Sequence, residues 1–368
     1  MIPGSPLIKN FPNHQNRLLK RTEFLFSYER YPLVYYLRFH ANKSGKPISS
    51  ILVPDYMCHE VNKTYRDFGY KVSFYPVSLD FSIDLDTLDN AVNSMNEKPQ
   101  VILIFHAYGK IVKNLKEILN YCQMKGIIPL EDCAHLPYPY FAHHSENSSN
   151  AKFYTLRKVY PVPYGAIAVI KDNQTEFDQF IQNNVKIIHD LNSYKMIKWI
   201  LREYLKRSIV FLGISVKRSY RDLSQDPLKK NNFAHKWVKL LIEEDEWKIQ
   251  IIKRRLNYIY FLKNIERFTN WITPIEYDVQ TDVPYKFIFY LREDIDKFKF
   301  INYFLSHGIS TELGLALEDQ FSKNDKNPFN RHVSFPLHQS IEFKHIEYIC
   351  NQLEQFQKLE NLNNKVNF

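Results

Sequence analysis

The chain has 368 residues, of which 45% are hydrophobic and 24% charged, a composition typical of a globular protein large enough for two lobes. It has 9 glycines and contains neither a GxGxxG motif nor a GxxxxGK motif followed by Ser or Thr, which argues against the common dinucleotide and P-loop sites. The 4 cysteines are scattered without a CxxC pair, so no zinc site or disulfide framework is implied, and a reducing, cytoplasmic location is expected.

The first part of the chain alternates between predicted helices and strands. Residues 1–25 are expected to form an irregular lead-in, and a helix opens within residues 27–33. Residues 50–54 form an apolar strand, which a loop and a helix ending near Phe68 follow. A second strand is predicted over 69–77, and a capped helix follows the Asp-rich turn at 80–88.

A continuous apolar run over 101–105 is typical of a strand that is buried on both faces of a parallel sheet. It ends in His106-Ala107-Tyr108-Gly109, a polar turn at the strand end where ligands bind in open α/β sheets. A histidine satisfied by loop backbone is an equally good interpretation of His106. A helix over 115–125 and an apolar strand over 127–130 come next.

That last strand leads into Glu131-Asp132-Cys133-Ala134-His135, and one lysine, Lys158, follows about two dozen residues later. A lysine amine can condense with the aldehyde of pyridoxal phosphate, and a carboxylate such as Asp132 can keep the ring nitrogen protonated. Taken alone, Lys158 is more often a surface charge and Asp132 a strand end or helix cap. A strand at 166–170 places Lys158 in a hairpin-like connection.

Residues 172–246 are predicted to be mostly helical and to hold a basic segment, in which part of the excess behind the net charge of +9 is concentrated. Between Lys195 and Arg221 there are eight cationic residues and one acid, interleaved with apolar residues. A solvated basic helix face is the favoured interpretation, and contact with an anionic membrane or nucleic acid is the alternative. No apolar stretch reaches the roughly 18 to 20 residues that a membrane span needs.

The alternation of strand and helix from 50 to 170 predicts an α/β fold with a mainly parallel sheet that is covered by helices on both faces. A long helix over 252–262, a strand over 286–291, a helix over 294–305 and a closing helix ending near Phe356 predict a smaller α+β unit. We therefore expect a lead-in at 1–25, a large domain at 26–248 with a basic, helical insert at about 172–246, and a small domain at 249–368.

The segments EDCAH (131–135) and LRKVYPVPYG (156–165), in this order and at this separation, resemble the DegT/DnrJ/StrS family of sugar aminotransferases. The resemblance covers roughly 28–170 and 250–357. It implies the fold-type I pyridoxal phosphate architecture, with a seven-stranded-type sheet sandwiched by helices and a small C-terminal domain. It also implies a homodimer that transfers an amino group, expected from glutamate, to a nucleotide-linked keto sugar for surface polysaccharide or glycoconjugate synthesis.

The resemblance assigns roles to individual residues. It implies that Lys158 is the catalytic lysine that links covalently to the cofactor, that Asp132 pairs with the ring nitrogen and that His135 contacts the ring. Thr155 is the expected hydroxyl for the cofactor phosphate.

The phosphate end departs from the family pattern. Backbone N–H groups at the start of the first helix hold the phosphate in the family, and Glu29 stands here where a small residue is usual. We expect Arg30 to compensate for the Glu29 charge. At the ring, strict register puts Cys58 where the family has a stacking aromatic residue, with Tyr56 and His59 nearby.

Three functions are compatible with these observations. A pyridoxal phosphate-dependent aminotransferase is favoured, because Lys158 is retained where the family's dehydratases carry His. A non-catalytic or accessory protein of the same fold, with weak or lost cofactor binding, is favoured by the departures at Glu29, Tyr164 and Ala166. A basic protein that uses 195–221 to contact membrane or nucleic acid is the third.

Overall fold

The computed structural model describes residues 24–140, 149–171, 173–186, 194, 197–202, 205, 233–234, 238, 246–323 and 327–360. The predicted lead-in lies almost entirely outside these residues. Most of the predicted insert at 172–246 also lies outside them, including the greater part of the basic segment 195–221. Within the described chain, no helix is both long and apolar enough to cross a membrane.

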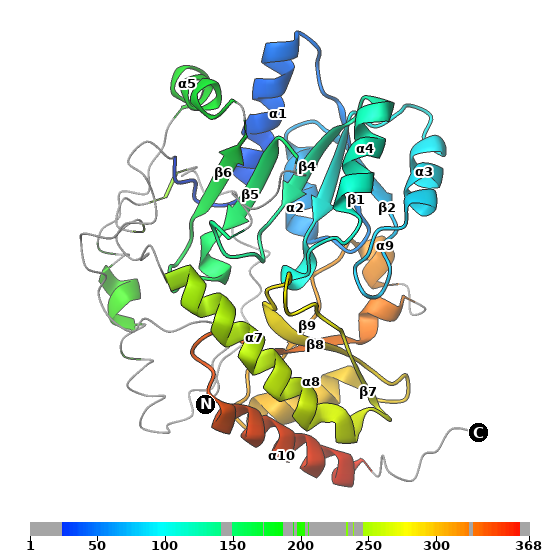
Figure 1. The fold of residues 1–368 in the computed structure, drawn as a ribbon, viewed down its shortest axis with the longest axis vertical. Coiled ribbons are helices and arrows are strands. Elements are labelled where there is room, and N and C mark those ends of the chain that lie inside the picture. The colour runs from blue at the N-terminus through cyan, green and yellow to red at the C-terminus, as the bar shows by residue number, and fades with distance from the viewer. Residues whose placement is uncertain are drawn as a thin grey trace.

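The N-terminal half of the fold is organised around one sheet (Figure 1). Its strand order is β2 (Lys71–Tyr75), β1 (Ser50–Pro54), β3 (Val101–Phe105), β4 (Ile128–Asp132), β5 (Ala151–Thr155) and β6 (Ala166–Ile170). All neighbours are parallel except β5 and β6, which are antiparallel. The predicted mainly parallel α/β sheet is confirmed, with six strands among the described residues rather than the seven that the resemblance implied.

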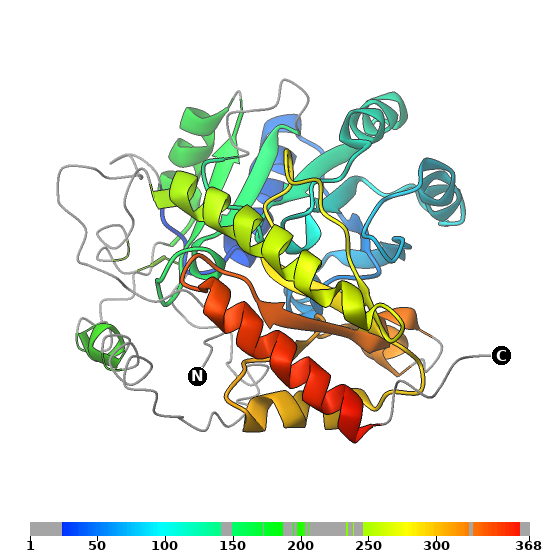
Figure 2. The same ribbon diagram turned by 60° about the horizontal axis from the view of Figure 1, so that its bottom comes forward.

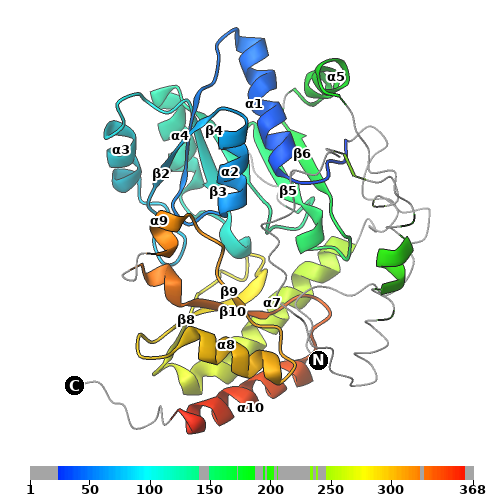
Figure 3. The same cartoon turned by 180° about the vertical axis from the view of Figure 1, so that it is seen from behind.

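Helices cover both faces of this sheet because successive strand residues point to opposite sides. Ile51, Val101 and Leu103 share one core with α1 (Arg30–Ser44), α2 (His59–Asp67) and α5 (Gln174–Asn184). Leu52 and Ile102 share the other core with α3 (Leu85–Asn93) and α4 (Leu115–Lys125). Figures 1 and 3 show these two layers from opposite sides.

The C-terminal part contains a second, antiparallel sheet in the order β7 (Ile272–Pro274), β8 (Lys286–Leu291), β10 (His332–Pro336) and β9 (Glu312–Leu313). It is accompanied by α7 (Glu246–Ile265), α8 (Lys297–Ser306), α9 (Asp319–Ser322) and α10 (Phe343–Leu359). The helix α10 packs along α7 (Figure 2). Buried aromatic side chains, among them Trp271, Phe287 and Phe335, fill the core. The predicted α+β unit is confirmed, and the boundary proposed at 248/249 falls in the first turn of α7.

A tight turn after β3, in the first sheet, is hydrogen-bonded to the segment that leads into β8, in the second sheet. The N–H of Val283 donates to the Gly109 carbonyl at 2.9 Å, and the N–H of Tyr285 donates to the Tyr108 carbonyl at 2.8 Å. Gly109 has φ +84°, and a Cβ built on it would lie 1.9 Å from the Val283 carbonyl oxygen. Only glycine therefore allows the chain before β8 to approach this turn so closely.

We predict that Gly109→Ala lowers the free energy of unfolding by about 2 to 4 kcal/mol, because it combines a left-handed backbone with a direct backbone clash. Gly45→Ala is the matched control, since Gly45 has φ +65° but a Cβ at that position would have no neighbouring heavy atom within 4 Å. It should cost about 1 kcal/mol. Urea denaturation measures the free energy of unfolding of both variants. Equal losses of stability in the two variants would show that the close approach of Val283 does not add to the cost at Gly109.

Candidate active site

The parallel pairing of β4 with β5 places the predicted lysine and aspartate at the same edge of the sheet. Asp132 is the last residue of β4 and is aligned with Phe153 of β5. Thr155 ends β5, and Lys158 ends the single 3₁₀ turn, Leu156–Lys158, that follows it. Asp132 is 1% exposed, and Lys158 is half-buried. The carboxyl ends of neighbouring parallel strands meet at one edge, where ligands bind in open sheets.

A chain of hydrogen bonds connects Lys158 to the turn after β3. The backbone N–H of Tyr108 donates to Nδ1 of His135 at 2.7 Å, and Nε2 of His135 lies 2.9 Å from Nζ of Lys158. Because Nδ1 is an acceptor, the neutral ring carries its proton on Nε2. That proton is directed at Nζ, the atom that would react with an aldehyde.

The surroundings keep His135 neutral. Burial, as the main cause, lowers the pKa of His135 well below its ordinary value, and the positive charges of Lys286, Arg157 and Arg254 act in the same direction. A protonated Lys158 would add to this effect. The imidazole also packs against two tyrosine rings that neighbour each other, with centroids 4.9 Å from Tyr108 and 4.7 Å from Tyr285 and 6.4 Å between the two tyrosines. These ring contacts restrict the position of the imidazole.

Glu29 enters the same site from the start of α1. It is the N-cap residue of that helix and is 8% exposed. Its Oε2 accepts the Thr155 hydroxyl proton at 2.5 Å, and its Oε1 has no hydrogen-bond partner among the described residues. Burial, followed by the negative charge of Asp132, raises the pKa of Glu29 well above its ordinary value, while Lys158 acts in the opposite direction. The Tyr65 hydroxyl, from α2, is buried without a partner in the described part of the chain. Burial, followed by the negative charges of Asp132 and Glu29, raises the pKa of Tyr65 well above its ordinary value.

We predict that the free energy of unfolding falls, relative to Glu29→Gln, as the pH rises above about 4.5, the ordinary value for a glutamate. The folded state favours the protonated carboxyl, so its contribution is complete below the unfolded pKa and is lost as the pH passes the raised folded pKa. The groups facing Glu29 are Asp132, Lys158, Thr155 and Tyr65.

Urea denaturation between pH 5 and pH 8 tests this dependence. Glu176→Gln, which removes an exposed carboxylate paired with Lys43, controls for the loss of one charge. A difference between wild type and Glu29→Gln that stays constant over this range would contradict the prediction.

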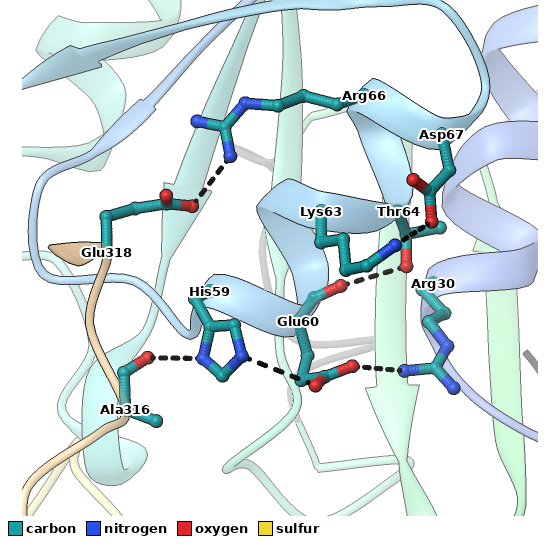
Figure 4. A network of polar contacts seen from close by, with 9 residues as sticks. All are labelled: Arg30, His59, Glu60, Lys63, Thr64, Arg66, Asp67, Ala316 and Glu318. Atoms are coloured by element: carbon teal, nitrogen blue, oxygen red, sulfur yellow. Dashed lines mark hydrogen bonds and ion pairs between the residues drawn. The ribbon is translucent and has the colours of Figure 1, made fainter. Parts of the chain in front are cut away.

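Arg30 is not brought into the group around Lys158. Its Nη1 lies 3.4 Å from Oε2 of Glu60 on α2, and the other Glu60 oxygen lies 3.4 Å from Nε2 of His59 (Figure 4). His59 in turn contacts the Ala316 carbonyl at 3.3 Å. The charge that was expected to compensate Glu29 is therefore engaged with a different carboxylate, and its role in cofactor binding stays a prediction.

The residues that the sequence placed near the cofactor ring or at the end of β3 contact other parts of the protein. Cys58 is the N-cap of α2, and Tyr56 is buried with its hydroxyl bonded to Tyr108, His332 and the Leu315 N–H. His106, at the end of β3, is buried with Nε2 3.1 Å from a Glu131 carboxylate oxygen. His106, Glu131 and Cys133 also have one potential metal-ligand atom each within 4.8 Å of the others. The hydrogen bond between His106 and Glu131 accounts for two of these three groups, so they carry no metal proposal.

The structure brings together Asp132, His135, Thr155 and Lys158, which the sequence singled out, and their roles toward a cofactor stay predictions. The sequence did not single out Tyr108 and Tyr285, whose rings pack against His135. Tyr108 could have been suspected from its place in the turn after β3. Tyr285 had no such indication, because nothing in its local sequence distinguishes it.

These residues fit one end of pyridoxal phosphate better than the other. Lys158 and Asp132 supply the amine and the carboxylate that an aldehyde and a ring nitrogen require, and Tyr65 has an unused buried hydroxyl beside Asp132. At the start of α1, where a phosphate would be expected, the Glu29 carboxyl holds the Thr155 hydroxyl. The ring end fits the described residues, and the phosphate end does not.

Comparison with solved structures identifies the fold as that of pyridoxal phosphate-dependent sugar aminotransferases. The chain superposes on the GDP-4-keto-6-deoxy-D-mannose-3-dehydratase of E. coli, solved with bound hydrated PLP, with a TM-score of 0.66 and 15% identity over 96% of this chain and 100% of that chain. It matches the sugar aminotransferase CalS13 of Micromonospora echinospora with a TM-score of 0.62 and 12% identity, over 96% and 100% of the two chains. It matches PseC of Helicobacter pylori, an aminotransferase involved in the biosynthesis of pseudoaminic acid, with a TM-score of 0.63 and 13% identity over 93% of this chain and 92% of that chain.

The sequence points to the same group of proteins. The model of the DegT/DnrJ/EryC1/StrS aminotransferase family matches residues 40–142, which confirms the resemblance over that part of the chain. No curated protein matches the chain.

Proposed function

We propose that this protein is a pyridoxal phosphate-dependent aminotransferase that transfers an amino group, expected from glutamate, to a nucleotide-linked keto sugar. The observation that carries the proposal is the contact between Lys158 Nζ and His135 Nε2 at 2.9 Å, at the strand edge that also holds Asp132. The family match and the shared fold support the same cofactor and the same broad chemistry.

When bound, the cofactor supplies an aldehyde that exchanges amines and a ring that accepts electrons. The chain's own residues would have three tasks. Asp132 would accept the ring N–H, and His135 would orient the Lys158 amine. Lys158 Nζ would take the proton from the carbon that carries the donor's amino group.

We predict that Lys158→Ala abolishes the covalent adduct and lowers kcat for amino transfer by at least about a thousandfold, because both the linkage and the base are lost. The test is to add pyridoxal phosphate, reduce with borohydride and map the labelled peptide. Label on Lys158 in the wild type, absent from the variant, is the expected result. Lys116→Ala, on the exposed face of α4, controls for labelling of surface lysines. A wild type without label on Lys158 at excess cofactor would contradict the aminotransferase.

Positive charge beside His135 supports an anionic substrate. Lys286, Arg157 and Arg254 all act on the His135 ring, and Arg157 is exposed next to Lys158. Lys286 is already paired with Glu312, and Arg254 donates to the Tyr285 carbonyl and to Gln339. Arg157 is therefore the most accessible of the three for a diphosphate group.

We predict that Arg157→Ala weakens the binding of nucleoside diphosphates by about tenfold, because a charge-assisted contact is lost. Calorimetric titration with GDP, UDP and dTDP measures the change, and the difference should shrink at high salt. Lys116→Ala provides the matched charge control. Unchanged affinity for all three nucleotides would remove Arg157 from the substrate site.

The homodimer, the cytoplasmic location and the polysaccharide pathway belong to the same proposal. One exposed face of α7 supports a partner chain, because Ile249, Ile252, Leu256 and Ile259 are 48% to 59% exposed at helical spacing. A non-catalytic protein of this fold remains the second candidate, and the position of Glu29 in the site is the observation that favours it.

A further inference from the structure

We propose that the described residues of this chain provide no site for the 5′-phosphate of the cofactor, because the Glu29 carboxyl takes that place, and that the protein binds a pyridoxal ring without phosphate about as well as the phosphate ester. This inference rests on the proposed function, since it concerns how the same cofactor is held. It is argued from the start of α1, from Glu29 itself and from the neighbouring charges.

The start of α1 offers few donors to an anion. A helix N-terminus attracts anions through N–H groups that have no partner within the helix. Here the Tyr31 N–H donates to the Tyr28 carbonyl at 3.1 Å. Pro32, the next residue, has no N–H. Two of the first three helical residues are therefore not available to bind a phosphate.

The side chains at this helix start are also unsuited to an anion. The Thr155 hydroxyl, the best local donor, is already bound by Glu29 Oε2 at 2.5 Å. Glu29 lies beside Asp132, so a phosphate placed here would bring its negative charge into a buried space that already holds two carboxyl groups. Burying a further charge without a paired cation is costly. Lys158 acts on Glu29, but its amine is engaged with His135.

Arg30, the nearest cation on α1 itself, is directed away from this position. It pairs with Glu60 on α2 (Figure 4). It also lies over the Tyr28 ring, with 4.8 Å between the guanidinium carbon and the ring centroid. Reaching a phosphate would require it to leave both partners. The contacts that remain for the cofactor, from Lys158, Asp132 and His135, all involve its ring and aldehyde.

Two probes separate the ring from the phosphate. Pyridoxal 5′-phosphate is compared with 5′-deoxypyridoxal, which keeps the ring and aldehyde and, lacking the 5′-hydroxyl, cannot close to an internal hemiacetal. Dissociation constants come from absorbance titration of the full-length protein, and borohydride reduction with peptide mapping confirms that Lys158 is the labelled residue. For the wild type we expect the two constants to agree within about threefold.

Two substitutions at Glu29 then test the cause. Glu29→Ser removes the charge and the bulk, and it should tighten pyridoxal 5′-phosphate at least about tenfold while 5′-deoxypyridoxal changes less than about threefold. Glu29→Gln keeps the size and the fold if Ser does not, and it should give a smaller gain because the side chain still fills the space. Inorganic phosphate should compete with the phosphate ester in Glu29→Ser but not in the wild type. Glu176→Gln, which removes an exposed carboxylate, should leave both constants unchanged.

The outcomes distinguish the two proposals. A wild type that binds the phosphate ester at least about tenfold more tightly than 5′-deoxypyridoxal, with Lys158 labelled by both, overturns this inference and leaves the aminotransferase intact. A wild type labelled by neither probe, with Glu29→Ser labelled by the phosphate ester, supports the role of Glu29 and contradicts the wild-type activity. Absence of Lys158 labelling in every variant overturns both.

Discussion

The parallel pairing of β4 with β5 is the constraint on which the candidate site depends. It brings Asp132 and Thr155 to neighbouring strand ends, and the single 3₁₀ turn after Thr155 then carries Lys158 to the same edge. Because β6 returns antiparallel to β5, the lysine is held in a short connection between two ordered strands. Its position therefore follows from the hydrogen-bonding pattern of the sheet rather than from a flexible loop.

The electrostatics of the candidate site depends mainly on which of its buried groups are neutral in the folded protein. His135 is kept neutral by burial and by surrounding cations, and its ring connects the Tyr108 N–H to Lys158. Glu29 and Asp132 are two carboxyls in a buried space, and the pKa of Glu29 rises accordingly. The site is thus balanced toward neutral donors and acceptors, which suits proton transfer more than it suits the binding of a doubly charged phosphate.

The C-terminal part of the chain supplies side chains that lie beside His135 in the candidate site. Tyr285 stacks on His135, and Lys286 and Arg254 add positive charge beside it. The close approach of Val283 to Gly109 brings these residues to the turn after β3. The same turn supplies the Tyr108 N–H that sets the His135 tautomer. The contact between His135 and Lys158 therefore depends on how the two sheets pack together.

Much of the fold could be predicted from the sequence, because apolar runs such as 101–105 and helical spacing such as 115–125 are local properties. Lys158, Asp132 and His135 could be named because they lie in short segments that resemble a known family. The strand β5 was not predicted, since the sequence AKFYT lacks a clear strand pattern and is buried only by its neighbours.

What the tertiary structure decided were the contacts between distant residues. Glu29 and Thr155 are 126 positions apart, and only the packing of α1 against the end of β5 brings the carboxyl to the hydroxyl. The partners of Arg30 and the stacking of Tyr285 on His135 depend on packing in the same way. Local sequence determines which groups are present and which elements carry them, whereas the space and charge around each group are set by elements that the chain brings back from elsewhere.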